Sequence, residues 1–409
     1  MHMLDRSCEI SIGYLLERFP VVAVIGARQV GKSTLIQKIW PAVRQFDLEN
    51  VRHLDLIEED VEFFLAQNPA PISLDEAQLS DALFKGIRVA VDRNRSQAGQ
   101  YLISGSSSPT LLKNISESLA GRIAIYELNP LTFEDALGLQ PSPFYSLLIE
   151  QDLDAIAGLK PRYTRAQLFD LSFNGGYPEH YLKRQDAIFH HQWMDNYIRT
   201  YIDRDIRALF PNLQLAVYRR FIRMLATSSG QLINASQFAR SLDVSQPTIK
   251  KYLEIAEGTF LWRSLPSFQS NRRKRVIKMP KGHFRDSGLV CGLLNIYSQD
   301  AWLNHPNFGQ IWESFIIEQV INSLKIRLQS FQYYFYRTQH QAEIDLVVEG
   351  EFGLIPFEIK TGFRTSAKKL RHLNTFIKEH NCPVGFVVNN SERVEKLADK
   401  IIQLPASCL

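Results

Sequence analysis

Short apolar segments alternate with stretches of helical periodicity through about the first 140 residues. The segments with strand character are residues 21–25, 44–48, 72–74, 101–104 and 123–128. Strands separated by helices in the sequence form parallel βαβ units, because a parallel pair needs a crossover connection. We therefore expect residues 1–140 to form an α/β domain with a parallel sheet.

The next segments are mainly helical. Residues 141–225 have helical periodicity that Gly175-Gly176-Tyr177-Pro178 interrupts, which predicts a helical linker or lid region. Residues 226–300 combine short helices with a strand at 259–265 and a basic run. These differences in periodicity predict separate structural regions.

Composition narrows the class of protein. Of the 409 residues, 45% are hydrophobic and 22% are charged, which is typical of a soluble globular protein. No apolar run approaches the ~18 residues that a membrane helix needs, and the charged N-terminal residues predict no secretory signal. The four cysteines are scattered and form no C-x-x-C pair, which indicates reduced cytoplasmic thiols rather than disulfides or a zinc site. The net charge of +4 is too small to indicate a nucleic-acid partner by itself.

Residues 26–33 carry a phosphate-binding motif. Their sequence, GARQVGKS, fits G-x-x-x-x-G-K-[ST] at every position, with an apolar strand run before it and a helical run after it. The glycines let backbone N–H groups turn toward phosphates at the positive end of the helix. We assign Lys32 to the β- and γ-phosphates and the Ser33 hydroxyl to a magnesium ion. The residues expected around the nucleotide are Gly26, Ala27, Arg28, Gln29, Val30, Gly31, Lys32, Ser33 and Thr34.

Two adjacent acids follow the strand at 72–74. A second carboxylate must help to hold the magnesium ion, and a base must orient the attacking water. We predict that Asp75 does the first and Glu76 the second. Glu76 also favours hydrolysis over phosphoryl transfer, which disfavours a small-molecule kinase.

Further polar residues are candidates for contact with the γ-phosphate. Ser104 ends its strand where ligands collect in open parallel sheets, and we predict that it senses the γ-phosphate. The alternative is an ordinary serine at a strand end. Arg28 and Arg122 are candidates for completing the positive charge around the phosphates, in this chain or from a neighbouring molecule. The alternative for both arginines is a solvated surface side chain.

Together these motifs resemble a bacterial and archaeal family of AAA-like ATPases that carry a C-terminal DUF4143 region. The resemblance continues beyond the ATPase motifs and covers nearly the whole chain. It implies the architecture and ATP binding, and it leaves the biological role open. The segments that carry it are GARQVGKSTL (26–35), PISLDEAQ (71–78), YLISGSSSPTLLK (101–113), SESLAGR (116–122), ELNPLTFED (127–135), NYIRTYIDRDIR (196–207), PKGHFRDSG (280–288) and residues 343–360.

The middle of the chain predicts a winged helix. A short helix at 236–242 and a turn precede Ser245, which caps a second helix. The predicted buried stripe of this second helix is Ile249, Leu253 and Ala256. The side chains left outward, in the arrangement of a recognition helix, are Gln246, Thr248, Lys250 and Lys251.

A basic run follows the strand at 259–265. Segment 271–281 holds six basic residues and no acid, which is enough to neutralise several phosphates of a nucleic acid. The alternative is that the run is solvated and that the winged helix packs against the nucleotide domain without binding nucleic acid.

The last segment, residues 301–409, places a long helix before two strands at 344–348 and 354–359. Asp345, Glu358 and Lys360 form a D-x12-E-x-K pattern on these strands, and a hairpin would bring them together. Two carboxylates bind a divalent metal, and a lysine orients the attacking water. The pattern resembles the PD-(D/E)xK nuclease superfamily.

The long helix supplies another candidate ligand. Glu313 lies on its apolar stripe, which is unusual for a purely structural helix, whereas Glu318 lies on the more polar side and is expected to be solvated. The alternative is that the spacing arose by chance, or that the fold persists without cleavage. The predicted ligands for magnesium or manganese are Glu313, Asp345 and Glu358.

We therefore expect an α/β protein of four regions: a P-loop AAA-type ATPase domain with a parallel sheet (1–140), a helical linker or lid (141–225), a winged-helix-like domain with the basic run (226–300) and an α/β restriction-endonuclease-like domain (301–409). The expected function is cytoplasmic ATP hydrolysis coupled to action on nucleic acid, with DNA as the first candidate and no membrane partner. Nuclease activity and self-association into a homo-oligomer are left open. The main alternative is a regulatory or defence switch, in which the nucleotide state gates protein–protein contacts and the C-terminal domain is an inactive scaffold.

Overall fold

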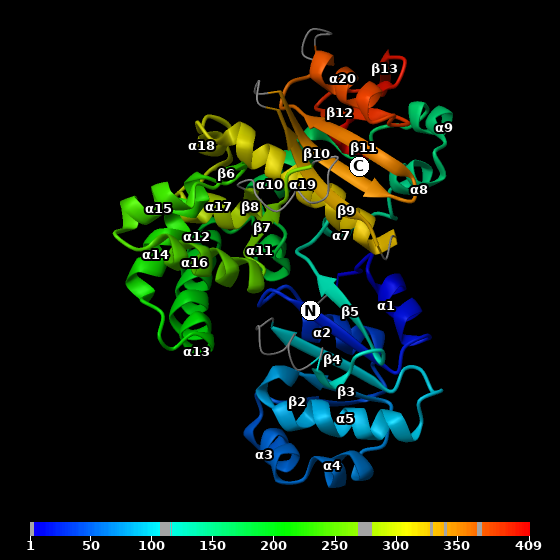
Figure 1. Cartoon of the computed structure of the whole chain (residues 1–409), viewed down its shortest axis with the longest axis vertical. Coiled ribbons are helices and arrows are strands. Elements are labelled where there is room, and N and C mark those ends of the chain that lie inside the picture. Colours follow the sequence, from blue (N-terminus) through cyan, green and yellow to red (C-terminus); the bar gives the residue numbers. More distant parts are fainter. Residues whose placement is uncertain are drawn as a thin grey trace. The chain divides into compact units, whose positions relative to one another are not determined.

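The computed structural model describes residues 4–106, 115, 117–268, 280–327, 330–338, 342–365 and 370–409, although not the side chains of residues 203 and 204. The chain divides into two compact units (Figure 1). One unit is Met1–Leu131 with Gly258–Leu261, and the other is Thr132–Glu257 with Trp262–Leu409. Among the described residues, no helix combines the length and the apolar character needed to cross a membrane.

The first unit is built on a parallel sheet, as the alternation of apolar segments predicts. All strand pairs are parallel, in the order β2-β3-β4-β1-β5. The strands are β1 (Val21–Gly26), β2 (Arg44–Asp47), β3 (Ile72–Asp75), β4 (Tyr101–Ser106) and β5 (Ile123–Leu128). The helices are α1 (Glu9–Leu16), α2 (Lys32–Ile39), α3 (Val51–Glu59), α4 (Val61–Gln67) and α5 (Asp81–Arg93), with a 3-10 turn at Ala77–Leu79.

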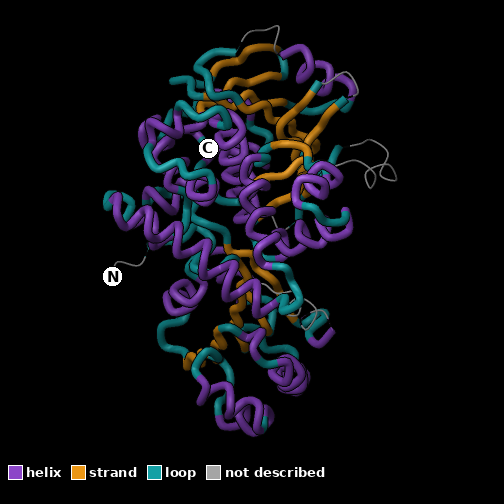
Figure 2. The backbone as a smooth tube through the Cα atoms, turned by 90° about the vertical axis from the view of Figure 1, so that its left-hand side faces the viewer, coloured by secondary structure: helices purple, strands orange, loops and turns teal. Residues whose placement is uncertain are grey.

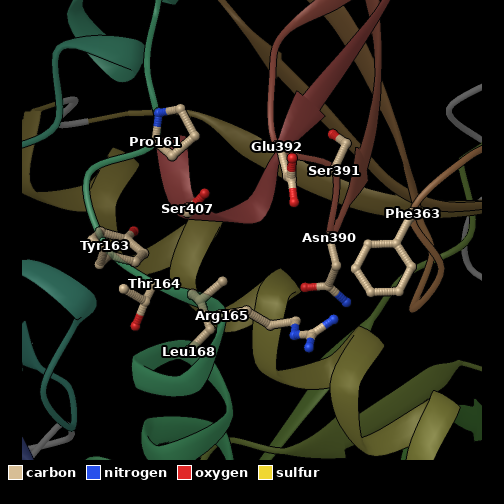
Figure 3. A pocket seen from close by; sticks show the side chains of 10 residues that line it. All are labelled: Pro161, Tyr163, Thr164, Arg165, Leu168, Phe363, Asn390, Ser391, Glu392 and Ser407. Atoms are coloured by element: carbon tan, nitrogen blue, oxygen red, sulfur yellow. The ribbon is translucent and has the colours of Figure 1, made fainter.

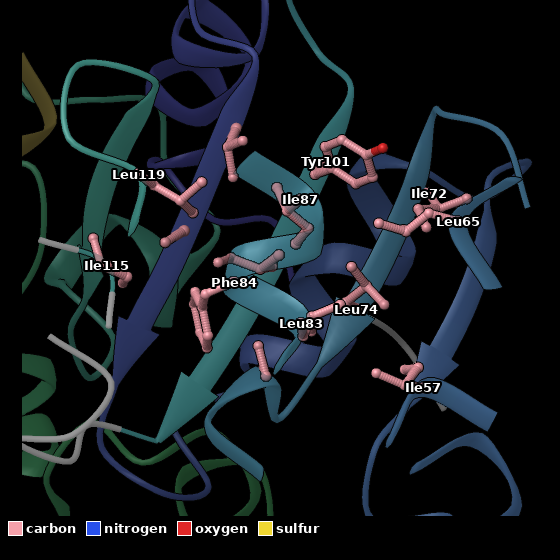
Figure 4. Close-up of a cluster of buried hydrophobic side chains, with 14 of the residues drawn as sticks. Ile57, Leu65, Ile72, Leu74, Leu83, Phe84, Ile87, Tyr101, Ile115 and Leu119 are labelled. Atoms are coloured by element: carbon pink, nitrogen blue, oxygen red, sulfur yellow. The ribbon is translucent and has the colours of Figure 1, made fainter. Parts of the chain in front are cut away.

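The core of this unit lies between the sheet and its helices (Figure 4). Phe84 and Ile87 of α5 are fully buried against Leu74 of β3 and other strand residues. Covered strands of this kind are apolar in nearly every position, which is why their sequences read as continuous apolar runs. The sheet is therefore a rigid base for the loops that leave its strand ends.

The second unit begins with helices, which Figure 2 colours purple. Gly175 and Gly288 explain the predicted glycine break. A Cβ on Gly175 would lie 2.3 Å from Asp286 Oδ1, and a Cβ on Gly288 would lie 2.2 Å from the Asn174 carbonyl oxygen. The helices α10 (Arg165–Asn174) and α17 (Ser287–Leu293) therefore approach too closely for any larger residue.

The other helices of this region are α7 (Phe133–Leu137), α8 (Pro143–Glu150), α9 (Leu153–Ala157), α11 (Pro178–Leu182), α12 (Ala187–Thr200), α13 (Arg207–Leu209) and α18 (Gln299–Leu303), with a π-helix at Tyr201–Ile206.

A winged-helix arrangement follows in the middle of the chain. Its elements are α14 (Leu215–Thr227), β6 (Gln231–Leu232), α15 (Ala235–Leu242), α16 (Gln246–Gly258), β7 (Trp262–Leu265) and β8 (Lys281–Phe284). The strands form an antiparallel sheet in the order β6-β8-β7. The strand predicted from residue 259 begins only at Trp262, because Phe260 has a φ of 59° in the left-handed region. The predicted basic run lies outside the described residues except for Lys281.

The C-terminal part is a mixed sheet with the order β13-β14-β12-β11-β10-β9. The elements are α19 (Phe308–Arg327), β9 (Gln332–Arg337), β10 (Glu343–Gly350), β11 (Gly353–Ile359), α20 (Arg371–Glu379), β12 (Gly385–Asn389), β13 (Glu395–Ala398) and β14 (Ile401–Pro405), followed by a 3-10 turn at Ala406–Cys408. β10 and β11 form the predicted antiparallel hairpin, and β11, β12 and β14 run parallel. The hairpin confirms the predicted pairing of the two strands that carry Asp345 and Glu358.

Candidate functional site

The phosphate-binding loop joins β1 to α2. Gly26 ends a fully buried strand, and a Cβ at this position would lie 2.4 Å from the Leu128 carbonyl oxygen. Gly31 has a φ of 98°, a conformation that favours glycine, and α2 begins at Lys32 immediately after it. The two glycines of the motif are therefore required by a close backbone approach and by a left-handed turn.

Lys32 is buried beneath this loop, at 5% exposure. Its ammonium donates to the carbonyl oxygens of Gly26 (3.3 Å) and Ala27 (3.1 Å), while Ser33 is exposed at the start of α2. A cation is thus held inside a loop of backbone N–H groups at a helix N-terminus, which is an arrangement that binds phosphate. Arg28 is half-buried and lies 3.9 Å from Glu49.

Arg6 supports the loop from the side, a role that no sequence motif indicated. Its guanidinium is buried and donates to the carbonyl oxygens of Val30 (3.2 Å) and Asn129 (2.6 Å). These bonds tie the loop to the segment that follows β5. The sequence shows only an arginine in the charged N-terminal segment, and such residues are usually exposed.

Asp75 and Ser104 meet at the carboxyl ends of β3 and β4. The pairing of Leu74 with Ile103 brings the next residue of each strand together, and the Ser104 hydroxyl donates to Asp75 Oδ1. Ser104 is 1% exposed, so its hydroxyl orients Asp75 from within the sheet. β4 continues two residues past Ser104 to Ser106, so the predicted strand ends too early, and the partner of Ser104 is the neighbouring carboxylate. Its contact with the γ-phosphate stays a prediction.

Glu76 follows in a left-handed conformation, with a φ of 54°. Its carboxylate accepts hydrogen bonds from the Gln78 side chain and from the Ser106 hydroxyl (3.1 Å). Burial alone would raise the pKa of Glu76, but the Lys32 ammonium, Gln78 and Ser106 together lower it. Glu76 is therefore an ionised carboxylate within the electrostatic reach of the phosphate-loop lysine. Gln78 and Ser106 are two partners that sequence reasoning missed, although both lie within the segments 71–78 and 101–113 that carry the family resemblance.

Arg122 lies away from this group. Its carbonyl accepts from Val21 N–H at the beginning of β1, so it occupies the edge of the sheet opposite the phosphate loop. Its guanidinium makes a two-point ion pair with Asp92, at 2.7 and 3.0 Å. The prediction that Arg122 contacts the nucleotide of its own chain is wrong, because the parallel strands put the residue before β5 at the far edge. Contact with the nucleotide of a neighbouring molecule stays a prediction.

A second group of charges gathers on the C-terminal sheet and α19. Asp345 of β10 and Glu358 of β11 lie on paired strands, and Lys360 Nζ lies 2.6 Å from Glu358 and 3.8 Å from Asp345. Asp345 Oδ2 also accepts from Ile359 N–H at 2.7 Å. Burial raises the pKa of Glu313 of α19, and the nearby Asp345 carboxylate raises it further, which places Glu313 in the same group. The residues predicted as metal ligands are therefore neighbours.

A lysine that the sequence did not single out lies among these carboxylates. Lys281 of β8 is 3% exposed, and its ammonium lies 2.5 Å from Glu313, 2.7 Å from Glu343 and 3.9 Å from Asp345. Burial alone would lower the pKa of Lys281, but the three carboxylates raise it above its ordinary range. A permanent positive charge thus lies where a metal cation would neutralise the acids. In the part of the chain that the structure describes, no group of three or more His, Cys, Asp or Glu residues is arranged to hold a metal ion.

Glu318 lies five residues after Glu313 on α19, and its predicted exposure is wrong. It is 3% exposed and accepts from the Arg263 guanidinium at two points and from His283 at 2.8 Å. Burial alone would raise the pKa of Glu318, but Arg263 and His283 lower it well below its ordinary value. Alternate residues of β8, Lys281 and His283, therefore anchor the winged-helix sheet to acids of α19.

The outward face of α16 has the predicted polar character. Gln246, Lys250 and Lys251 are exposed, and Ser245 accepts from Thr248 N–H at 3.3 Å. Lys251 also borders a cavity of about 570 Å³ beside the turn between α15 and α16. The buried stripe differs in one detail. Tyr252 and Ile255 are buried and Leu253 only half-buried, because the helix also packs against Tyr218 and Phe221 of α14.

Comparison with known proteins agrees with this arrangement. Family models match residues 18–137 (an AAA domain), 165–300 (a domain of unknown function, DUF8612) and 308–409 (a domain of unknown function, DUF4143). Uncharacterised proteins of Mycobacterium bovis and Mycobacterium tuberculosis are each 33% identical over 394 residues, which is 96% of this chain and 81% of each relative. The chain belongs to this family of AAA-like ATPases with a C-terminal DUF4143 domain.

Solved structures with similarity to this AAA-like chain are more distant. A Walker-type ATPase of Pyrococcus abyssi is 15% identical with a TM-score of 0.44, covering 71% of this chain and 96% of its own. The Holliday junction branch migration motor RuvB of Thermotoga maritima is 14% identical with a TM-score of 0.31, covering 64% of this chain and 90% of its own. At these values neither similarity carries a conclusion about function. The AAA domain itself is of a nucleotide-binding type that typically uses magnesium.

Proposed function

We propose that this protein hydrolyses ATP and couples the hydrolysis to action on nucleic acid, with DNA as the first candidate. The observation that carries the proposal is the meeting of Lys32, Asp75 and Glu76 at one edge of the parallel sheet. In open parallel sheets this edge is where ligands bind, and the three side chains supply the charges that phosphate hydrolysis needs.

The residues present fit a nucleotide with its magnesium ion. The buried ammonium of Lys32 supplies positive charge for the phosphates, and the exposed hydroxyl of Ser33 would be a magnesium ligand. Asp75, oriented by Ser104, is the carboxylate that would support the ion. Magnesium would neutralise charge on the phosphates.

Glu76 is the base that orients the attacking water. Its ionised carboxylate can accept a proton or a hydrogen bond from water, and Gln78 and Ser106 fix its direction. The hydrogen bonds from Gln78 and Ser106 must break if water is to bind the Glu76 carboxylate in their place. We therefore propose that Gln78 and Ser106 hold Glu76 in its resting position.

The winged-helix region is the proposed contact with nucleic acid. The face of α16 presents Gln246, Lys250 and Lys251 to solvent, and the sequence has six basic residues between 271 and 281. Helices of this kind enter a groove of duplex DNA, and flanking lysines and arginines neutralise phosphates. Lys281 is directed to the carboxylates instead, which leaves five cations of the run for the proposed contact.

An ATPase assay with and without nucleic acid tests this function. Purified protein is incubated with ATP and magnesium alone, with duplex DNA, with branched DNA and with RNA. The proposal expects ATP turnover, stimulated several-fold by at least one of the nucleic acids. Turnover that every nucleic acid leaves unchanged would refute the coupling, and absence of turnover in all mixtures would refute the hydrolase.

A second candidate function is a nucleotide-gated switch whose C-terminal domain makes protein contacts without cleaving nucleic acid. The observation that favours it is Lys281, whose ammonium already balances Glu313, Glu343 and Asp345. A magnesium or manganese ion at this cluster, and any nuclease activity that depends on it, would require Lys281 to withdraw. Lys360 beside Glu358 would then be positioned to orient water.

A further inference from the structure

A cavity of about 430 Å³ lies at the carboxyl ends of β11, β12 and β14, where it faces the beginning of α10 (Figure 3). Phe363 follows β11, Asn390 follows β12, and Ser407 follows β14. Arg165 begins α10 on the opposite wall. Its volume is that of a small-ligand site, and its position at parallel strand ends is where such ligands bind.

One buried polar atom in this cavity has no partner among the described residues. Asn390 is 7% exposed, and its Oδ1 accepts no hydrogen bond from them. Its Nδ2 donates to the Thr361 carbonyl oxygen at 2.8 Å and its backbone N–H to the Gly362 carbonyl at 3.1 Å. Because the Thr361 carbonyl can only accept, the side-chain amide cannot reverse, and Oδ1 remains an unsatisfied acceptor in a residue that lines the cavity. A buried acceptor without a donor is costly, so the site is suited to a ligand that donates there.

The other walls supply a cation and an aromatic surface. The Arg165 guanidinium lies over the Phe363 ring, 5.0 Å from its centre, and Phe363 is 51% exposed. Figure 3 shows both side chains beside the carboxamide of Asn390. Planar cations and aromatic rings are surfaces on which nucleobases stack, and a guanidinium also binds phosphate.

We propose that this cavity binds one nucleotide of a single-stranded nucleic acid, with its base against Phe363 and Arg165 and a base amino group donating to Asn390 Oδ1. The inference rests on the proposed action on nucleic acid and names the form of substrate that the C-terminal domain takes. Adenine and cytosine carry an exocyclic amine for this contact, whereas thymine carries a carbonyl there.

The position of the cavity links it to the charged cluster of β11. Lys360 immediately precedes Thr361, Gly362 and Phe363, and its backbone N–H donates to Val388 of β12 at 2.9 Å. The strand end that carries Lys360 thus continues directly into the cavity wall. A strand held here by one base would pass beside the carboxylates and the lysine.

The test measures the affinity of the full chain for short labelled oligodeoxynucleotides by fluorescence anisotropy, with a non-hydrolysable ATP analogue saturating the phosphate loop. Phe363→Ala and Arg165→Gln change exposed side chains, so both variants should melt at the wild-type temperature. We expect each to bind a single-stranded dC oligomer roughly tenfold more weakly, as removal of one stacking surface predicts. Ile188→Ala, which truncates an apolar side chain that is 72% exposed on α12, should bind as wild type does.

Further binding measurements distinguish the possible outcomes. Wild type should prefer dC and dA oligomers over dT several-fold, and Asn390→Ser should reduce that preference. If free dCMP binds as tightly as the oligomer and Phe363→Ala weakens its binding, the cavity binds the base by the proposed contacts, and its ligand is a free nucleotide. If Phe363→Ala and Arg165→Gln bind the single strand as wild type does while Lys250→Ala with Lys251→Ala loses DNA, the cavity proposal is wrong and the proposed function stands. If neither DNA nor dCMP binds to any form, both fail.

Discussion

The ammonium of Lys281 lies 2.5 Å from the Oε1 of Glu313, which joins the winged-helix sheet to the helix that covers the C-terminal sheet. Glu343 and Asp345 complete the surroundings of this ammonium. Carboxylates that share a site repel one another unless a cation lies between them. Lys281 is that cation here, and a divalent metal would have to compete with it.

Removing the Lys281 ammonium should show whether it competes with a metal ion for the carboxylates. Lys281→Met should melt at a lower temperature than wild type without metal, because the carboxylates lose their buried counter-charge. Adding manganese without nucleotide should then stabilise the variant more than wild type, by roughly 2–3 kcal/mol at a concentration about a hundredfold above its Kd. Lys396→Met removes an exposed lysine and serves as the control. An equal gain in stability from manganese in wild type, Lys281→Met and Lys396→Met would show that Lys281 does not block a metal site.

The carboxylates themselves give the complementary prediction. If Glu313, Asp345 and Glu358 hold manganese or magnesium, wild type should gain thermal stability from the metal, and the Asp345→Ala, Glu358→Ala double variant should not. Any cleavage of nucleic acid should need the metal and disappear in Lys360→Ala. Stabilisation without cleavage would favour an inactive or regulated domain. The same metal response in wild type and the double variant would make the D-x12-E-x-K pattern a coincidence and favour the switch function.

Glu318 should be important for stability in a pH-dependent way. Its pKa is depressed below its ordinary value of 4.5, so the carboxylate stabilises the fold above that pH and loses the contribution as pH falls. Glu318→Gln leaves the buried Arg263 without a counter-charge and should cost roughly 3 kcal/mol at neutral pH. Its melting temperature should also decline less steeply than that of wild type below pH ~4.5. Glu179→Gln, in an exposed pair with Lys183, is the matched control and should cost at most about 0.5 kcal/mol. Parallel acid profiles for wild type and Glu318→Gln would contradict the assignment.

The central strands of the ATPase sheet, β1, β3 and β4, could be predicted because they are buried and read as apolar runs, whereas β2 at the edge is largely exposed. The same reasoning, followed to the end, places Arg122 correctly. A residue just before β5 must lie at the amino edge of a parallel sheet, whereas the phosphate loop leaves the carboxyl edge. Strand direction alone therefore separates Arg122 from the phosphate loop.

The charged contacts of α19 could not be predicted from periodicity. A helical stripe separates an inner from an outer face, but α19 is buried on most sides, including polar positions such as Gln319 and Asn322. Glu318 therefore lies inside although it is off the apolar stripe. Lys281 is one of six basic residues in its segment, and nothing local distinguishes the one that reaches Glu313, 32 positions away. Such pairings depend on tertiary contacts.

The basic run should dominate the salt dependence of nucleic-acid binding. Replacing Arg272, Arg273, Lys274 and Arg275 with alanine should weaken binding and reduce the slope of log affinity against log salt by roughly one for each phosphate that is no longer neutralised. The charge of Lys281 is already balanced by carboxylates, so it is left unchanged in this variant. A slope equal to that of wild type would show that the run is a solvated surface.

The phosphate loop and the acid pair give the most direct prediction. Lys32→Ala should abolish ATP hydrolysis, since it removes the cation assigned to the β- and γ-phosphates. Glu76→Gln should still bind ATP, because Lys32, Ser33 and Asp75 remain, but its turnover should fall by about a hundredfold or more without the base. Binding is measured with a fluorescent ATP analogue and turnover by phosphate release. Loss of both in Glu76→Gln would make the residue structural, and equal turnover in wild type and Glu76→Gln would remove Glu76 from the mechanism.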